Sequence, residues 1–355
     1  MPRFVSISLA IFTVSLLVYV ACIRSSPTAD FVNATVSSVI RRALADATRF
    51  LPFSLFELLI ILAPVILSML VFLLVRRGTD RVHRVRGVMA VVGAVSLIFT
   101  SYIYTLGIGY HTTPLDERIG IEADSDISAD ELLLTVNAVL DEINAIAPTL
   151  TPVDGQTRLS YSTDELSAQL VEAYGAMIER YPILTPFDSR VKPVRFSTVM
   201  SDLRIMGIYS FFTGEANVNV EYPDYCLVFT SAHEMAHQRG ISRENEANFV
   251  AFLVAISSDD EYIRYAGYLN LYEYLVSALY SLDHDLYYSV HSRLHATARA
   301  DIRASSAVYN EHKDSVLGRI NERLNDAYLK ANGTEGVVSY GYVVRLAVAY
   351  YCDEA

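Results

Sequence analysis

The stretch that decides the fold of this chain reads His233-Glu234-Met235-Ala236-His237-Gln238-Arg239-Gly240-Ile241-Ser242-Arg243-Glu244-Asn245-Glu246. Its first five residues place two histidines four positions apart, so on a helix both imidazoles lie on one face and reach a single metal ion. Glu234, between them, is placed to hold a water molecule beside that metal. This is the HExxH zinc pattern, and a chain of this composition is expected to contain it by chance on the order of 0.01 times.

A third metal ligand is expected downstream of His237, because catalytic zinc sites use three protein ligands and keep one position open. Gly240 is typical of a helix end and Ser242 of a helix start, which predicts a turn and a second helix from about Arg243. In proteases whose third histidine follows six residues after the second, that position is here Arg243, which cannot bind a metal, so that class is excluded. Glu244 and Glu246 remain as candidates. We expect Glu246, one turn into the second helix beside its apolar face, to be the ligand.

Three apolar stretches precede this region, at about Phe4–Ile23, Phe53–Val75 and Val88–Gly107. Each is close to the roughly 20 residues that a membrane-spanning helix needs. Five arginines lie within residues 76–86, and the positive-inside rule places that loop in the cytoplasm. The sequence therefore predicts a multi-pass membrane domain over residues 1–110 with a cytoplasmic amino terminus, and a domain over residues 111–355 outside the membrane. The alternative interpretation of the first stretch is a cleaved signal peptide, which leaves the large domain outside as well.

The charge divides at the same boundary. Residues 1–110 carry ten arginines against four acidic residues, a net charge of +6, whereas the remainder has a net charge of −18, for −12 overall. The composition is 52% hydrophobic and the mean hydropathy is +0.29, which favours a membrane protein over a disordered one. The acidic second part excludes a nucleic-acid partner, because such binding needs clustered Lys and Arg against phosphates.

After residue 110 the pattern is mostly helical. Serine and glutamate at capping-box spacing, from Ser128 and from Ser162, predict helices near Ala129–Ala147 and Thr163–Arg180. The alternation of polar and apolar residues over 215–220 predicts a half-buried strand. The predicted fold class is therefore mainly α: three transmembrane helices followed by a mostly helical α+β domain with a small sheet.

Several segments resemble a known family: Gly214–Asn219, His233–Gly240, Arg243–Phe249, Leu324–Lys330 and Gly336–Gly341. On these segments the chain is similar to DUF3810, a family of uncharacterised bacterial membrane proteins, and the similarity covers nearly the whole chain. The resemblance implies a zincin-like, gluzincin-like metallopeptidase domain at the bacterial cell membrane. It carries the zinc ligands onto His233, His237 and Glu246 and the base onto Glu234. It names no substrate.

The predicted activity is hydrolysis of peptide bonds outside the cytoplasmic membrane. Zn²⁺ lowers the pKa of water toward about 7, and Glu234 accepts the proton as that water attacks a polarised carbonyl. We expect the strand ending at Val220 to be a sheet edge along which an extended peptide lies. The side chains expected to face that peptide are Glu215, Asn217 and Asn219. Candidates for stabilising the transition state are Tyr328 and Tyr340.

Two alternatives come from other classes. The first is a non-enzymatic, zinc-stabilised binding or assembly protein anchored in the membrane, which a fourth protein ligand would favour. The second is a zinc hydrolase that acts on a non-peptide amide of the cell envelope. A metalloprotease whose HExxH helix lies in the bilayer is disfavoured by the polar run at residues 238–248. The expected partners are therefore the lipid bilayer and a peptide or protein substrate outside it.

Overall fold

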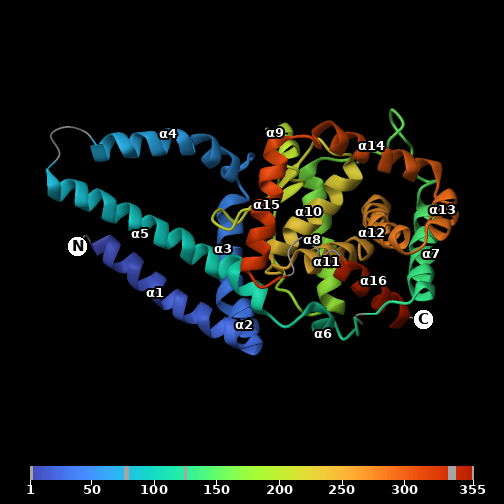
Figure 1. Ribbon diagram of the computed structural model, residues 1–355, viewed down its shortest axis with the longest axis horizontal. Helices are drawn as coiled ribbons and strands as arrows, with labels where there is room; N and C mark the ends of the chain where they lie inside the picture. The colour runs from blue at the N-terminus through green and yellow to red at the C-terminus, as the bar shows by residue number, and fades with distance from the viewer. Residues whose placement is uncertain (1–2, 76–79, 124–125, 335–340, 354–355) are drawn as a thin grey trace.

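The structure is a computed structural model that describes residues 3–75, 80–123, 126–334 and 341–353, and it is mostly helical with one small sheet (Figure 1). Three long helices project from one end of a helical domain, as Figure 1 shows in blue and cyan. The predicted fold class is confirmed. The elements before the domain are α1 (Arg3–Arg24), α2 (Ser26–Val32), a π-helical turn η1 (Asn33–Ser37), α3 (Ser38–Thr48), α4 (Leu55–Val75), α5 (Arg81–Thr105) and a 3₁₀ turn η2 (Gly107–His111).

The remaining elements form the domain around the HExxH segment. They are α6 (Leu115–Ile119), α7 (Ala129–Ile146), α8 (Thr163–Arg180), β1 (Val191–Val194), α9 (Ser197–Asp202), β2 (Gly207–Tyr209), β3 (Ala216–Asn219), α10 (Asp224–Gln238), α11 (Glu244–Ile256), α12 (Glu261–Leu282), α13 (His284–Ser292), α14 (Ala296–His312), α15 (Val316–Ala331) and α16 (Gly341–Asp353). Both predicted capping boxes are present, at Ser128 with Glu131 and at Ser162 with Glu165. They begin α7 and α8 where the sequence predicts helix starts, because each serine accepts from a backbone N–H that the first turn leaves free.

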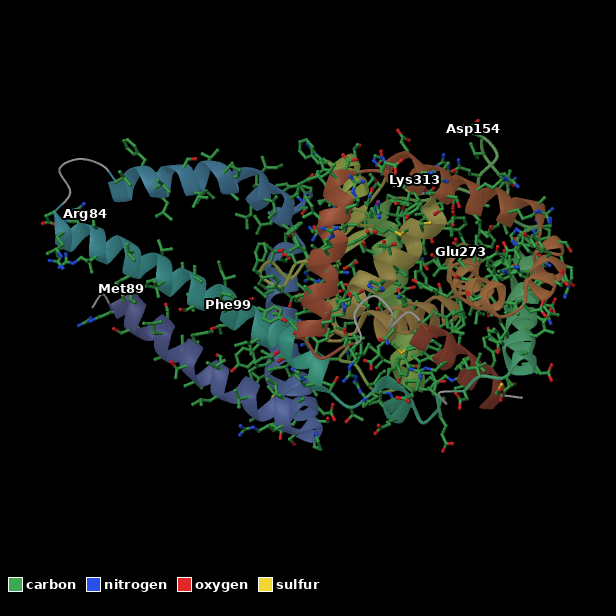
Figure 2. All side chains as sticks on the ribbon, in the orientation of Figure 1. Arg84, Met89, Phe99, Asp154, Glu273 and Lys313 are labelled. Carbon is green, nitrogen blue, oxygen red and sulfur yellow. The ribbon has the colours of Figure 1, made fainter. Side chains whose placement is uncertain are left out.

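Helices α1, α4 and α5 are long and apolar enough to cross a membrane. Many of their apolar side chains are exposed, among them Phe99 on α5, which Figure 2 labels. Helix α1 packs along α5, and the remaining faces of the three helices carry exposed apolar side chains, which are stable only where lipid or another protein covers them. These three helices therefore indicate that the chain associates with a membrane.

The segment between α1 and α4 packs on the domain rather than standing apart from it. The Arg41 side chain is fully buried and donates to the carbonyl of Arg239, just after α10. The Lys192 ammonium, from β1, donates to the carbonyls of Thr48 and Leu51. These contacts join the polypeptide between the first two apolar helices to the part of the chain that holds the histidines.

The sheet has the order β1-β3-β2, with β1 parallel and β2 antiparallel to β3. The predicted strand is therefore present as β3, but it is the central strand and not an edge. Pro193 lies in β1, which is an edge strand, where a residue without an N–H is tolerated. The strand open to a further partner next to α10 is β2.

The core lies between the sheet and the helices α7, α8, α10, α11, α12 and α16. Helices α10 and α11 are buried on nearly all sides, which is typical of central helices in a large core. They pack on each other and on α12. A rigid pair of buried helices is a suitable support for side chains that must hold a fixed geometry.

Candidate functional site

The two histidines lie one turn apart near the end of α10. The helix ends in a tight turn in which Gly240 adopts φ +101°, and Ile241 N–H donates to the carbonyl of Ala236. Only glycine adopts such a backbone conformation without strain, so Gly240 permits the reversal. The chain then returns, and α11 begins at Glu244 as the sequence predicts.

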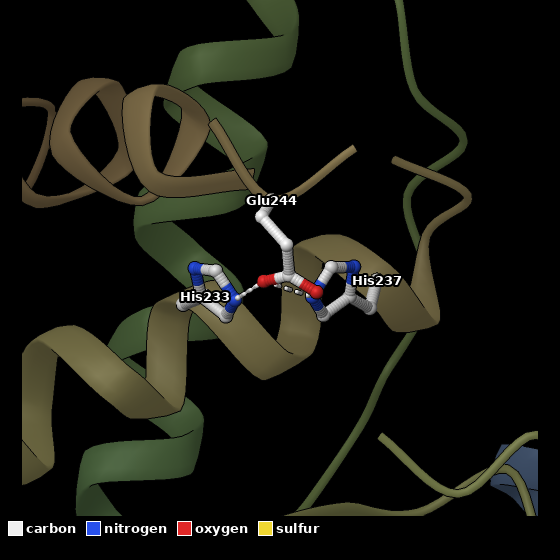
Figure 3. Close-up of side chains that lie close together, drawn as sticks. All are labelled: His233, His237 and Glu244. Atoms are coloured by element: carbon white, nitrogen blue, oxygen red, sulfur yellow. Dashed lines mark hydrogen bonds and ion pairs between the residues drawn. The ribbon is translucent and has the colours of Figure 1, made fainter. Parts of the chain in front are cut away.

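Glu244 lies between His233 and His237, as Figure 3 shows. Its Oε2 atom is 3.2 Å from Nε2 of His233 and 3.5 Å from Nε2 of His237. Ligand atoms about 2.0–2.2 Å from a tetrahedral zinc ion lie roughly 3.3–3.6 Å from one another, so these separations suit zinc. One ligand atom from each of the three residues lies within 4.8 Å of the others.

The histidine rings are oriented for binding through Nε2. The carbonyl of Ile241 lies 2.7 Å from Nδ1 of His237, and because a carbonyl only accepts, Nδ1 is the protonated nitrogen. The Nε2 lone pair of His237 therefore faces Glu244. A backbone partner that fixes the tautomer in this way is a regular feature of metal-binding histidines.

The charges within the cluster depend on one another. Burial alone lowers the pKa of His237, but the negative charge of Glu244 and its hydrogen bond outweigh burial and raise that pKa to about 9. Burial raises the pKa of Glu244, and the two histidines more than reverse this effect, so its pKa lies well below the ordinary value. The Glu244 carboxylate is thus ionised and lies beside the protonated His237 imidazole. A metal cation can take the place of the imidazole proton.

The prediction that Glu246 joins the histidines is wrong in this structure. Glu246 is 1% exposed and accepts from the Arg243 guanidinium at 2.6 Å and from the Leu115 N–H at 3.1 Å. Residues two positions apart on a helix point about 200° apart, so a helix start that directs Glu244 toward α10 directs Glu246 away from it. Glu246 instead fastens α11 to the chain that follows α5.

Glu234 lies against the edge strand β2. Burial raises its pKa to about 6, and the backbone N–H of Tyr209 partly offsets that rise. A Cβ added at Gly207 would lie 2.5 Å from Oε1 of Glu234 and 2.5 Å from Cγ2 of Thr230. Gly207 therefore lets β2 approach the HExxH helix, a contact that the sequence analysis did not anticipate.

The outer edge of β2 faces the same carboxylate. On the sheet side, Met206 accepts from the Asn219 N–H and Ser210 donates to the Glu215 carbonyl. Because successive residues of a strand point their backbone groups to opposite sides, those of Gly207 and Tyr209 point away from β3. The structure thus places the outer edge of β2 beside Glu234, and the Tyr209 N–H on that edge donates to the carboxylate.

The three residues expected to contact a substrate from β3 do not line an open edge. Glu215, Asn217 and Asn219 are 1%, 0% and 2% exposed. Glu215 accepts from the backbone N–H groups of Leu55 and Phe56, at 3.0 and 2.8 Å, where α4 begins. β1 and β2 pair with both edges of β3, so its main chain is not open to a peptide, and the side chains of these three residues are buried against neighbouring chain segments. The predicted substrate role is wrong.

Asn217 and Asn219 have similar structural partners. Asn217 Oδ1 accepts from the Ser54 hydroxyl at 2.6 Å. Asn219 Nδ2 donates to the Ser201 hydroxyl and to the carbonyl of Ile205. The strand therefore anchors the loops on either side of it.

Tyr328 contacts the ring of Tyr110, which lies between it and the start of α11. Tyr328 comes from α15, and its ring contacts those of Tyr102 and Tyr110 edge to face, with centroids 6.4 and 6.1 Å apart. The Tyr110 carbonyl accepts from the Arg243 guanidinium at 3.0 Å, so Tyr110 lies at the start of α11, and burial raises the pKa of its hydroxyl. Tyr110 is a further candidate donor, and no local motif marks it in the sequence. Tyr340 lies outside the described residues.

A cavity of about 710 Å³ adjoins Glu244. Much of its wall is apolar, with Leu132, Leu282 and Val344 among the lining residues, and Arg243 and Arg345 add charge. The side chains of His233 and Glu244 are 13% and 31% exposed, so solvent reaches the cluster. Pockets of this size with a few polar groups are typical of sites for small ligands or peptide side chains.

Residues of the segment between α1 and α4 bind the end of α10. Asn33 Nδ2 donates to the Gly240 carbonyl at 3.1 Å, and the Asn33 carboxamide oxygen accepts from Arg41 at 2.8 Å. A cation at a helix carboxyl terminus is favourable because carbonyl groups are unpaired there. No local motif marks this contact, since residues 33 and 240 are far apart in sequence.

Fold and site together define a class of protein: a helical membrane-associated chain in which two adjacent buried helices bring a His–His–Glu cluster beside the glutamate of an HExxH segment. The model of the family described as "Protein of unknown function (DUF3810)" matches residues 33–348. The chain therefore belongs to the DUF3810 family. The comparison with curated proteins gives no match, and the comparison with solved structures gives none either.

Proposed function

We propose that this chain is a membrane-anchored zinc metallopeptidase that cleaves peptide bonds outside the cytoplasmic membrane. The observation that carries the proposal is the distance of 3.2 and 3.5 Å from one Glu244 oxygen to the two histidine Nε2 atoms, with Glu234 on the same helix. The residues that would hold Zn²⁺ are His233, His237 and Glu244. A bound zinc ion supplies Lewis acidity, which polarises a carbonyl and acidifies water.

Glu234 is suited to the role of base. With a pKa of about 6, its carboxylate is mostly ionised at neutral pH and still close enough to neutrality to accept and return a proton. Its Oε2 atom is buried without a hydrogen-bond partner among the described residues, so one oxygen is free to accept. Burial also keeps competing bulk water away from the transfer.

The substrate is proposed to bind along β2 as an extended peptide. Main-chain pairing with a strand edge is a common mode of peptide recognition, and the outward groups of Gly207 and the Tyr209 carbonyl lie on the edge of β2 that contacts Glu234 through the Tyr209 N–H. Such pairing places a substrate carbonyl next to the base without requiring a particular side chain. The adjoining apolar cavity would then accept an apolar side chain of the substrate.

The number of candidate ligands in the cluster favours a catalytic metal site over a purely structural one. Structural zinc sites are closed by four protein ligands, whereas catalytic sites use three. Within the described part of the chain, the group of candidate ligands has three members, His233, His237 and Glu244. This favours the enzyme over the zinc-stabilised binding protein.

The orientation of the chain follows from charge. We propose that the arginine-rich loop between α4 and α5 lies in the cytoplasm and that the domain from residue 111 lies outside it. The amino terminus, one helix earlier, is then also cytoplasmic. Cysteine labelling from either side of intact cells tests this topology.

The test of the activity uses the full-length chain in detergent with a peptide library, and Glu234→Gln as the inactive control. We expect cleavage by the zinc-loaded protein, loss of cleavage in Glu234→Gln, and equal zinc content in both. Cleavage that persists undiminished in Glu234→Gln would overturn the mechanism. A zinc-loaded protein that cleaves no peptide but releases amine from envelope material would favour the non-peptide hydrolase.

A further inference from the structure

Helix α15 has one face made only of exposed apolar side chains. These are Val316, Leu317, Ile320 and Leu324, which are 60%, 47%, 50% and 65% exposed. At 100° per residue they span about a third of the helix circumference, and Ala327 lies on the same face. On a surface exposed to water such a face would be unfavourable in free energy, because the apolar side chains are large and contiguous.

The opposite face of α15 fixes its orientation on the domain. A Cβ at Gly318 would lie 2.8 Å from Nε of Arg204, so the helix packs closely on that side chain. Asn321 Nδ2 donates to the carbonyl of Leu203 at 3.0 Å, and Arg204 binds Glu322. With this side held against α9, the apolar face points away from the domain.

The charged residues of α15 are arranged as in helices that lie in a membrane surface. Arg319 and Arg323 lie along one border of the apolar face, followed by Lys330, which also pairs with Asp326 at 2.7 Å. Long basic side chains at such a border bury their methylene groups in the interface and reach the phosphate level with their charge. A face meant for a second protein would not need these basic side chains.

The position of α15 matches a membrane surface. Figure 1 shows α15 at the end of the domain from which α1, α4 and α5 project, and it runs across their direction. The Tyr102 hydroxyl, near the end of α5, donates to Asn332 Oδ1 at 2.7 Å, just after α15. Phe31, on α2, and Phe50, two residues after α3, belong to the segment between the first two apolar helices and are 68% and 74% exposed.

We propose that α15 is an interfacial helix that lies in the surface of the lipid bilayer, with Val316, Leu317, Ile320 and Leu324 inserted between the lipids on the side of the folded domain. The proposal needs only the apolar helices and the packing of α15, and it does not depend on the metal site. Tyr328 of α15 contacts Tyr110, and the Tyr110 carbonyl accepts from Arg243, the residue before Glu244, so the proposal also places the cluster close to the bilayer surface. If the proposed peptidase activity holds, its substrates are then peptide segments near that surface.

The test exploits the absence of tryptophan from this sequence. Leu324→Trp, in the full-length chain reconstituted in phosphatidylcholine vesicles, introduces a single reporter on the apolar face. Phe72→Trp, in α4, is the control inside the membrane. Tyr288→Trp, 61% exposed on α13 at the far end of the domain in Figure 1, is the control in water. Tryptophan fluorescence is compared in vesicles with and without bromine on the acyl chains, which quenches only tryptophans that contact lipid tails.

We expect bromolipid to quench Leu324→Trp to a degree close to that of Phe72→Trp and to leave Tyr288→Trp unchanged. Ile320→Trp repeats the measurement one turn earlier and serves if Leu324→Trp fails to fold. Quenching no greater than that of Tyr288→Trp in both variants overturns the proposal. That includes blue-shifted emission without quenching, which would instead indicate a second copy of the chain on this face.

Discussion

Glu273, in the middle of α12, makes the stability of the domain depend on pH, and one substitution removes that dependence. Figure 2 shows Glu273 within the crowded helical part of the molecule. Burial raises its pKa from 4.5 to about 7, and the hydrogen bond from the Tyr225 hydroxyl, at 2.9 Å, offsets part of that rise. We expect Glu273→Gln to stabilise the protein above pH 8 and to leave its stability nearly unchanged at pH 4.

The sign and the magnitude follow from proton binding. A carboxyl with a higher pKa in the folded than in the unfolded state binds more protons when folded, so the free energy of unfolding falls as the pH rises between those two values. One pKa unit corresponds to about 1.4 kcal/mol, so the ionised Glu273 lowers the free energy of unfolding by at most about 3.5 kcal/mol above pH 8. Glutamine keeps an acceptor for Tyr225 and carries no charge, which removes that cost.

Circular dichroism at 222 nm during heating measures the effect on the purified full-length chain in detergent. We expect the melting temperature of Glu273→Gln to exceed that of the wild type by about 5–10 °C at pH 8.5, given roughly 2–4 °C per kcal/mol in a domain of this size. The two proteins should melt together at pH 4. A difference that is the same at both pH values, or a Glu273→Gln protein less stable at pH 8.5, would refute the reasoning.

Three further substitutions test how neighbouring segments support the site. Gly207→Ala should displace the Glu234 carboxylate, because the added Cβ would lie 2.5 Å from Oε1 of Glu234. We expect peptide cleavage to fall roughly 10²-fold with the zinc content unchanged. Unaltered cleavage would argue against β2 as the neighbour of the base. Glu215→Ala should lower the free energy of unfolding by about 2–3 kcal/mol, because two charge-assisted hydrogen bonds at the start of α4 are lost, and we expect a lower melting temperature. An unchanged melting temperature would count against that contact. Arg41→Met should lower the free energy of unfolding by about 2–4 kcal/mol and make the turn at Gly240 more mobile, which faster amide hydrogen exchange at that turn would measure. Unchanged exchange would show that Arg41 does not stabilise the end of α10.

Local sequence patterns predicted those parts of the fold that local interactions determine. Ser128 and Ser162 each form a capping box within four residues, and the structure begins a helix at each. The apolar stretches depend on composition alone, and they appear as α1, α4 and α5. The HExxH helix and the turn at Gly240 likewise depend on residues that are close in sequence.

The errors concern contacts between distant segments. The alternation over 215–220 predicts a strand, but its place in the sheet depends on pairing with β1, whose Pro193 hides the strand signal. Glu244 and Glu246 have similar local surroundings in the sequence. Which of them meets the histidines depends on where α11 begins and on the Leu115 and Arg243 groups that bind Glu246.

We propose that Glu244, together with His233 and His237, forms a zinc site. The most direct measurement is the zinc content of the purified full-length wild type and of the His237→Ala, Glu244→Ala and Glu246→Gln variants, each checked for folding by circular dichroism. We predict about one zinc ion per chain in the wild type and in Glu246→Gln, and loss of zinc in the other two. Retention of zinc by Glu244→Ala together with its loss from a folded Glu246→Gln would contradict the account, as would a folded wild-type protein that takes up no zinc.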